Sequence, residues 1–127
     1  MDAYYAHSIK IYDTQQEENE LRKISSIVKN IVNPKHIRWT GSMEPYFKAV
    51  KNSDLVFATE YKSFIGKGVF DEVKTALDVG IPVYTLRSGK VFKVRGVAIN
   101  DPYDCKFKYG KINIYPGEVK INDKRIY

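Results

Sequence analysis

The sequence predicts an α/β protein: a Rossmann-like (flavodoxin-like) parallel sheet with helices on both faces, plus a β-rich C-terminal extension. Two observations carry this prediction. Short β-prone apolar runs alternate with amphipathic helical segments through residue 86, which is typical of parallel strands joined by right-handed crossovers. After Arg87-Ser88-Gly89 the pattern changes to short alternating runs. With 127 residues, 43% of them apolar, the chain is expected to fold as one domain around its own core.

The core is expected to occupy residues 1–86. Four strands are predicted, at residues 3–9, at either 31–33 or 37–40, at 54–59 and at 81–86. Three helices are predicted, after Thr14 to about residue 30, at 43–51 and at 68–79. The apolar run at 54–59 suits a strand that is buried on both faces.

Capping residues support the helix boundaries. Thr14-Gln15-Gln16-Glu17 fits a capping box, in which Thr14 caps the helix and Glu17 reaches back. Ser42 is expected to cap the second helix, with Pro45 in its first turn, and Gly80 to end the third.

The extension over residues 87–127 is basic. It holds 10 Lys/Arg and 4 Asp/Glu, whereas residues 1–86 hold 11 of each, so it carries the whole net charge of +6. Alternating runs at 91–94, 106–109, 111–115 and 119–121 predict strands, with turns at Tyr109-Gly110-Lys111 and Pro116-Gly117. Such a segment can bind nucleic acid, but its scattered lysines favour an ordinary solvated surface.

Several classes of protein are excluded. The single cysteine, Cys105, excludes an intramolecular disulfide, and His7, His36 and Cys105 share no metal-ligand spacing, so we expect no metal and no cofactor. No apolar run reaches the roughly 20 residues of a membrane span. The first residues lack the basic and apolar regions of a signal peptide, so we expect a cytoplasmic protein with no membrane partner.

A ligand site is expected beyond the carboxyl ends of the strands. His7, Ser8 and Tyr12 follow the first strand. Gly66, Lys67 and Gly68 precede the third helix, whose N-terminus offers free N–H groups to an anion. These six residues are therefore predicted to bind substrate, although a strand-end histidine such as His7 is more often satisfied by the backbone.

Glu72 is the candidate catalytic residue on the third helix. The apolar stripe of that helix consists of Val69, Phe70, Val73, Ala76 and Leu77. Glu72 lies at the edge of the stripe, where a carboxylate is partly desolvated and suits a nucleophile or base. The alternative is an ordinary boundary glutamate paired with a lysine.

The run from Gly68 to Val83, GVFDEVKTALDVGIPV, resembles the G-x-x-x-E-x-x-x-A-x-x-x-G-x-P-V signature of the nucleoside 2-deoxyribosyltransferase-like superfamily. That superfamily includes base-exchanging transferases and hydrolases of nucleoside 5′-monophosphates. The resemblance implies that Glu72 is the nucleophile. It covers about residues 3–86 and also implies a homo-oligomer, often a dimer with shared sites.

Three further segments resemble this superfamily. Asn52-Ser53-Asp54-Leu55-Val56 matches a strand start whose aspartate helps to protonate the base, which assigns that role to Asp54. Tyr4-Tyr5-Ala6 matches the opening strand, which makes Tyr4 the tyrosine that approaches the nucleophile. Asn33-Pro34 resembles the motif after the second strand. Where the superfamily has glycines after the first strand, this chain has Ala6-His7-Ser8.

The leading hypothesis is cleavage or transfer at the N-glycosidic bond of a nucleoside or nucleoside 5′-monophosphate, with Glu72 as nucleophile. The second is a nucleotide-binding or sensing module without turnover. The third is a nucleic-acid-associated protein that uses residues 87–127. Trp39 can stack on a base, but we expect it in the core or at an interface.

Overall fold

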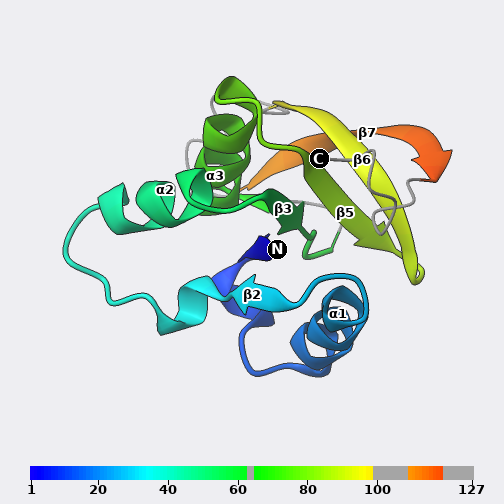
Figure 1. Ribbon diagram of the computed structural model, residues 1–127, viewed down its shortest axis with the longest axis horizontal. Coiled ribbons are helices and arrows are strands. Elements are labelled where there is room, and N and C mark those ends of the chain that lie inside the picture. Colours follow the sequence, from blue (N-terminus) through cyan, green and yellow to red (C-terminus); the bar gives the residue numbers. More distant parts are fainter. Residues whose placement is uncertain (63–64, 99–108, 119–127) are drawn as a thin grey trace.

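The computed structural model describes residues 1–62, 65–98 and 109–118, and it is an α/β structure with a mostly parallel sheet (Figure 1). The helices are α1 (Gln15–Ser25), α2 (Glu44–Lys51) and α3 (Lys67–Asp78), with 3₁₀ turns η1 (Ile9–Ile11) and η2 (Pro34–His36). The strands are β1 (Asp2–Ala6), β2 (Asn30–Val32), β3 (Leu55–Ala58), β4 (Ile65–Gly66), β5 (Val83–Arg87), β6 (Lys90–Ala98) and β7 (Tyr109–Glu118).

The sheet has the strand order β2-β1-β3-β5-β6-β7-β4. Its first four strands are parallel, and Tyr4 of β1 pairs with Val32 of β2 on one side and with Val56 of β3 on the other. β6 then runs antiparallel to β5. Because the chain passes from β1 to β2 on one side and to β3 on the other, the winding direction reverses between β1 and β3. A reversal of this kind opens a crevice at the carboxyl ends of the two strands.

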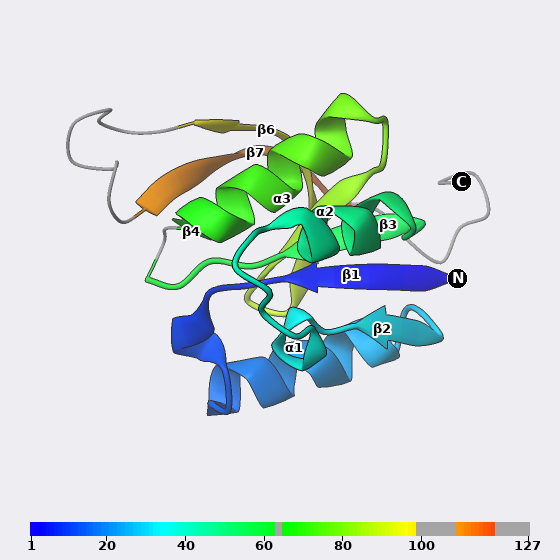
Figure 2. The same ribbon diagram turned by 90° about the vertical axis from the view of Figure 1, so that its left-hand side faces the viewer.

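Helices cover both faces of the parallel strands (Figure 2). Successive strand residues point to opposite faces. Tyr4 and Ala6 therefore pack with Val50 of α2 and Val73 of α3, whereas the other face of β1 packs against Ile24 of α1. Burying each of the valine and isoleucine side chains among them stabilises the fold by roughly 1.5–3 kcal/mol. The prediction of helices on both faces is confirmed.

The first half of the chain follows the prediction with shifted boundaries. Thr14 caps α1 by accepting a hydrogen bond from the amide of Glu17 at 3.3 Å, as expected. Glu17 does reach back, but its Oε1 accepts from the amide of Asp13 at 3.1 Å. β1 ends at Ala6 instead of residue 9, because Ser8 caps η1 directly afterwards.

Further along the chain, α1 ends at Ser25, earlier than the predicted residue 30. The chain needs the residues between them to turn, because β2 already begins at Asn30. β2 corresponds to the first of the two segments proposed for the second strand. Met43 takes the N-cap position of α2 without a side-chain hydrogen bond, while Ser42 accepts from the amide of Glu44 at 3.3 Å.

The turn predicted at Tyr109-Gly110-Lys111 is wrong, because these residues begin β7. The turn predicted at Pro116-Gly117 is also wrong; these residues lie within β7, where the register with β6 shifts between Phe92 and Val94. β7 therefore has more residues than β6 between these two pairs, and a bulge accommodates the extra residues of β7. The segments 106–108 and 119–121 and Cys105 lie outside the described residues, so the nature of the whole extension stays a prediction.

Within the described part of the chain, no helix is long and apolar enough to cross a bilayer. The same residues contain no group of three or more His, Cys, Asp or Glu side chains arranged to hold a metal ion.

Candidate functional site

A cavity of about 610 Å³ lies at the carboxyl end of β1 and the start of α3. Its lining comes from three segments: His7, Ser8, Ile9, Lys10 and Tyr12 after β1; Gly66, Gly68, Val69 and Glu72 at α3; and Pro34, Trp39, Met43 and Tyr46 from η2 to α2. This is the crevice expected from the reversal of the strand order between β1 and β3. Its volume lies within the roughly 300–1,000 Å³ of small-molecule sites.

Glu72 lines this cavity with a side chain that is almost wholly buried. The residue is 4% exposed, and the hydroxyl of Tyr4 donates a hydrogen bond to its Oε2. Burial raises the pKa of Glu72 to about 8; the hydrogen bond from Tyr4 acts against this rise, and the neighbouring Asp71 adds to it. At neutral pH Glu72 is therefore mostly protonated, and modest changes around it switch its charge.

Three tyrosines line or support the cavity beside this carboxyl group. Tyr4 is fully buried, and burial, followed by the charge of Glu72, raises its pKa well above the usual value. Burial and Glu72 also raise the pKa of Tyr12 to about 12. Tyr46 is held by a hydrogen bond from its hydroxyl to the Ile37 carbonyl at 3.3 Å. Tyr4 and Tyr12 therefore stay neutral at physiological pH, and Tyr4 donates its hydrogen bond to Glu72 without adding a compensating positive charge.

The start of α3 supplies polar backbone to the cavity. Gly66 is the N-cap and provides no side-chain hydrogen bond, so the N–H groups of the first turn have no side-chain cap. Both Gly66 and Gly68 line the cavity, as expected. A Cβ at Gly68 would contact only Met43, at 3.8 Å. Lys67 is not among the described lining residues, and it forms an exposed ion pair with Asp71 at 2.7 Å.

The imidazole of His7 makes its contacts within the protein. Its Nδ1 lies 2.8 Å from the Tyr5 carbonyl oxygen and its Nε2 lies 2.8 Å from Oε2 of Glu17. Both ring nitrogens are therefore engaged within the protein. The ring also stacks on Tyr5, with centroids 3.7 Å apart. His7 lines the cavity, and its contact with the Tyr5 carbonyl agrees with the alternative of a histidine satisfied by the backbone.

Asp54 is not brought to the cavity. It precedes β3, at the amino edge of the sheet, where its Oδ2 accepts a hydrogen bond from the amide of Asp2 at 2.8 Å and the residue is exposed. Parallel strands place their amino ends at one edge and their carboxyl ends at the other. Tyr4 and Glu72 meet as predicted, but the structure separates Asp54 from both.

Sequence reasoning assigned no site residue to the third segment of the lining, although it noted that Trp39 can stack on a base. Trp39 is 60% exposed, so it does not lie in the core, and the alternative position at an interface stays a prediction. Tyr46 and Met43 lie on or beside α2, a helix whose residues gave no chemical signal. Lys10 was missed as well, although Ser8 and Tyr12 on either side of it were named. The one sequence signal for Lys10 was its position between Ser8 and Tyr12.

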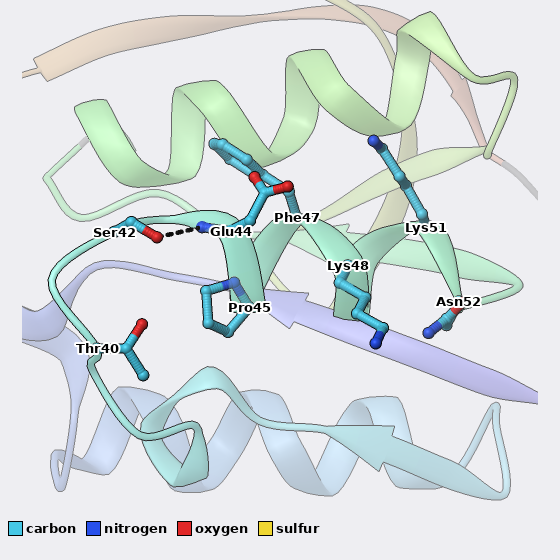
Figure 3. Close-up of a pocket in the computed structure, with 8 residues that line it drawn as sticks. All are labelled: Thr40, Ser42, Glu44, Pro45, Phe47, Lys48, Lys51 and Asn52. Carbon is cyan, nitrogen blue, oxygen red and sulfur yellow. Dashed lines mark hydrogen bonds between the residues drawn. The ribbon is translucent and has the colours of Figure 1, made fainter.

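A second hollow of about 590 Å³ lies along α2 (Figure 3). Lys48 and Lys51 line it together with Glu44 and Ser42, and all four are exposed. Phe47 points from α2 toward α3 in this view. No described residue of this lining is a buried ionisable group, so the hollow lacks the perturbed chemistry that marks the Glu72 cavity.

Comparisons with known proteins support the fold alone. No family model matches the chain, and no curated protein matches it. A solved structure described as a conserved protein from Enterococcus faecalis V583 superposes with a TM-score of 0.51 at 20% sequence identity. The match covers 67% of this chain and 62% of the other, so this chain spans less than two thirds of that protein.

Proposed function

We propose that the protein cleaves or transfers the N-glycosidic bond of a nucleoside or nucleoside 5′-monophosphate, in the manner of the nucleoside 2-deoxyribosyltransferase-like superfamily. One observation carries the proposal: the buried carboxyl group of Glu72, held by Tyr4, lines a cavity of substrate size. The strand order of the parallel part also agrees with a flavodoxin-like arrangement.

In the proposed reaction a carboxylate oxygen of Glu72 attacks C1′ of the sugar. The bond between C1′ and the base nitrogen breaks through an oxocarbenium-like transition state, and the base leaves with the electron pair. Water, or a second base, then attacks C1′ and releases the sugar from Glu72. The hydroxyl of Tyr4 orients the carboxylate and stabilises its charge.

The departing base needs a proton, and Asp54 is not placed to give it. Among the described lining residues Glu72 is the sole carboxyl group. We assign this proton to water entering through the cavity mouth. A 5′-phosphate would lie at the N–H groups of the first turn of α3, near Ser8 and Lys10 of the opposite wall.

The protonation of Glu72 sets the pH dependence. Since only the ionised carboxylate is a nucleophile and its pKa is about 8, kcat/KM is expected to rise with pH and to level off above that value. Tyr4→Phe removes a hydrogen bond that stabilises the carboxylate, so the rise should move to higher pH.

The direct test incubates the protein with ribo- and deoxyribonucleosides and their 5′-monophosphates and follows free base by chromatography. Glu72→Gln keeps the shape of the side chain and should lower the rate about 10³-fold. Glu18→Gln, an exposed change on α1, is the matched control and should leave the rate unchanged. Equal base release by wild type and Glu72→Gln would exclude the proposed mechanism.

A nucleotide-binding module without turnover is the second candidate. It is favoured by the protonated state of Glu72 at neutral pH and by the lack of a second carboxyl group among the described lining residues. This candidate predicts saturable binding of nucleotides, measured by calorimetry, with no free base after prolonged incubation.

A further inference from the structure

The rim of the Glu72 cavity carries an exposed aromatic side chain. Trp39 lies in the segment between η2 and α2, which swings away from the sheet (Figure 1). It lines the cavity and is 60% exposed. It is also the one tryptophan of the whole sequence. Because Trp39 and the exposed Ile9 line the same cavity, they form an exposed apolar surface of the kind that marks ligand-binding grooves.

The geometry around Trp39 leaves its ring accessible. Its ring centroid lies 6.2 Å from that of Tyr46 and the two planes are inclined by 42°, so the rings are not stacked face to face. Met43, from the same chain segment, and Ile9, which is 78% exposed and follows β1, also line the cavity. The lining therefore has an apolar and aromatic component.

The lining also has a polar part with different chemistry. Glu72 and Tyr12 belong to it, together with Gly66 and Gly68, and the buried Tyr4 holds Glu72 from behind through its hydrogen bond. A ligand that satisfies both parts has a flat apolar ring joined to a group rich in oxygen. A heteroaromatic base joined to a sugar has this division, and bases stack on exposed indole rings without requiring a particular sequence of donors and acceptors.

We infer that Trp39 is the stacking platform for the base of the substrate, with Tyr46 and Met43 bounding it, so that the sugar lies over Glu72. This inference rests on the proposed function and adds the orientation of the substrate. Because stacking uses the face of the ring and no fixed hydrogen bonds, the site should accept both purines and pyrimidines.

The single tryptophan makes the test specific, because fluorescence excited near the red edge of the protein band comes from Trp39 alone. Glu72→Gln protein, in which turnover is blocked, is titrated with AMP, CMP and ribose 5-phosphate. We expect saturable quenching by both nucleotides and none by the sugar phosphate. Saturable nucleotide binding by calorimetry without quenching would overturn the inference.

Steady-state kinetics provide a second measurement. Trp39→Leu should raise KM about tenfold or more with little change in kcat, because stacking contributes to binding and not to the reacting bond. Trp39→Phe should restore most of the affinity. Thr40→Ala is the matched control, since Thr40 is the exposed neighbour and lines the other hollow. Unchanged KM in Trp39→Leu would also overturn the inference.

These outcomes separate the two proposals. Quenching by nucleotides without base release from wild type would remove the proposed function and keep the platform. Base release with no quenching would keep the proposed function and remove the platform. If neither base release nor quenching is seen, both proposals are rejected. If instead Trp39 is covered by a second copy of the chain, its emission should change on dilution of the free protein and nucleotides should not quench it, which rejects the platform.

Discussion

At the residue scale, the burial of Glu72 lowers the stability of the fold and raises the pKa of its carboxyl group. A carboxyl group that is 4% exposed loses its hydration, and the single hydrogen bond from Tyr4 does not replace it. The protein therefore holds the proton on Glu72 to about pH 8. A core glutamine or leucine would avoid this penalty, so the buried acid supports the proposed chemical role of Glu72.

This burial predicts how stability depends on pH. The folded-state pKa of Glu72, about 8, is raised above its ordinary value of 4.5. Its contribution to stability is therefore fully present below pH 4.5 and is lost as the pH rises through about 8. Glu72→Gln cannot ionise, so its free energy of unfolding should fall less than that of wild type between pH 5 and pH 9, measured by urea denaturation.

The control for this experiment is Glu18→Gln. Glu18 is exposed on α1 and pairs with Arg22 across one helical turn. Its variant should follow the wild-type curve throughout. If Glu72→Gln also runs parallel to wild type, Glu72 ionises as readily in the folded protein as in the unfolded chain, and the premise that burial holds its proton is wrong.

At the scale of elements, η1 forms one wall of the cavity, and the His7–Glu17 pair attaches this short turn to α1. The side chains of His7 and Glu17 are 0% and 5% exposed, and Glu17 also accepts hydrogen bonds from the Asp13 amide and from Lys35. Burial acts to raise the pKa of Glu17, but its hydrogen bonds outweigh burial and the pKa lies below its usual value. A 3₁₀ turn of three residues cannot hold its own position, so these contacts set the shape of the wall.

Glu17→Ala should therefore lower the free energy of unfolding by about 2 kcal/mol, because it leaves Nε2 of the buried His7 without its hydrogen-bond partner. Urea denaturation at pH 7 measures this change. The exposed pair is the comparison: Glu18→Ala should cost at most about 0.5 kcal/mol. A loss for Glu17→Ala no larger than that for Glu18→Ala would show that the buried pair does not fasten η1 to α1.

At the scale of the whole molecule, the site depends on the strand order. Tyr4, Trp39 and Glu72 are far apart in the sequence and line or support one cavity because β1 lies between β2 and β3. β1 and β3 are interior strands of the sheet, hydrogen-bonded on both sides, and every residue of β3 is buried.

Native-state hydrogen exchange should reflect this arrangement. Amides of β1 and β3 are expected to exchange at least about tenfold more slowly than those of β2, after correction for intrinsic rates. β2 is three residues long and lies at the edge of the sheet. Mass spectrometry of peptides from each strand measures the difference. Equal protection of β1 and β2 would contradict the strand order on which the cavity depends.

Local patterns in the sequence determined much of this protein. The capping role of Thr14, the apolar β3 strand, the position of Glu72 at the edge of an apolar stripe and the contact of Glu72 with Tyr4 were all expected, and the structure shows each of them. The first three are features of one segment, where hydrogen-bonding groups and apolar residues recur at the spacing of a helix or strand. The contact with Tyr4 was implied by the resemblance, which carries three-dimensional information from other proteins.

Tertiary structure alone decided which side chains share the cavity. Asp54 was expected there and lies at the opposite edge of the sheet, whereas Lys67 pairs with Asp71 and Trp39 lines the rim. Asp54 was assigned to the site by the resemblance, although its position before a parallel strand puts it at the amino edge. The course of the chain between η2 and α2 follows no periodic pattern. These choices depend on packing between distant segments, since that packing determines the register of the strands and the path of the connecting chain.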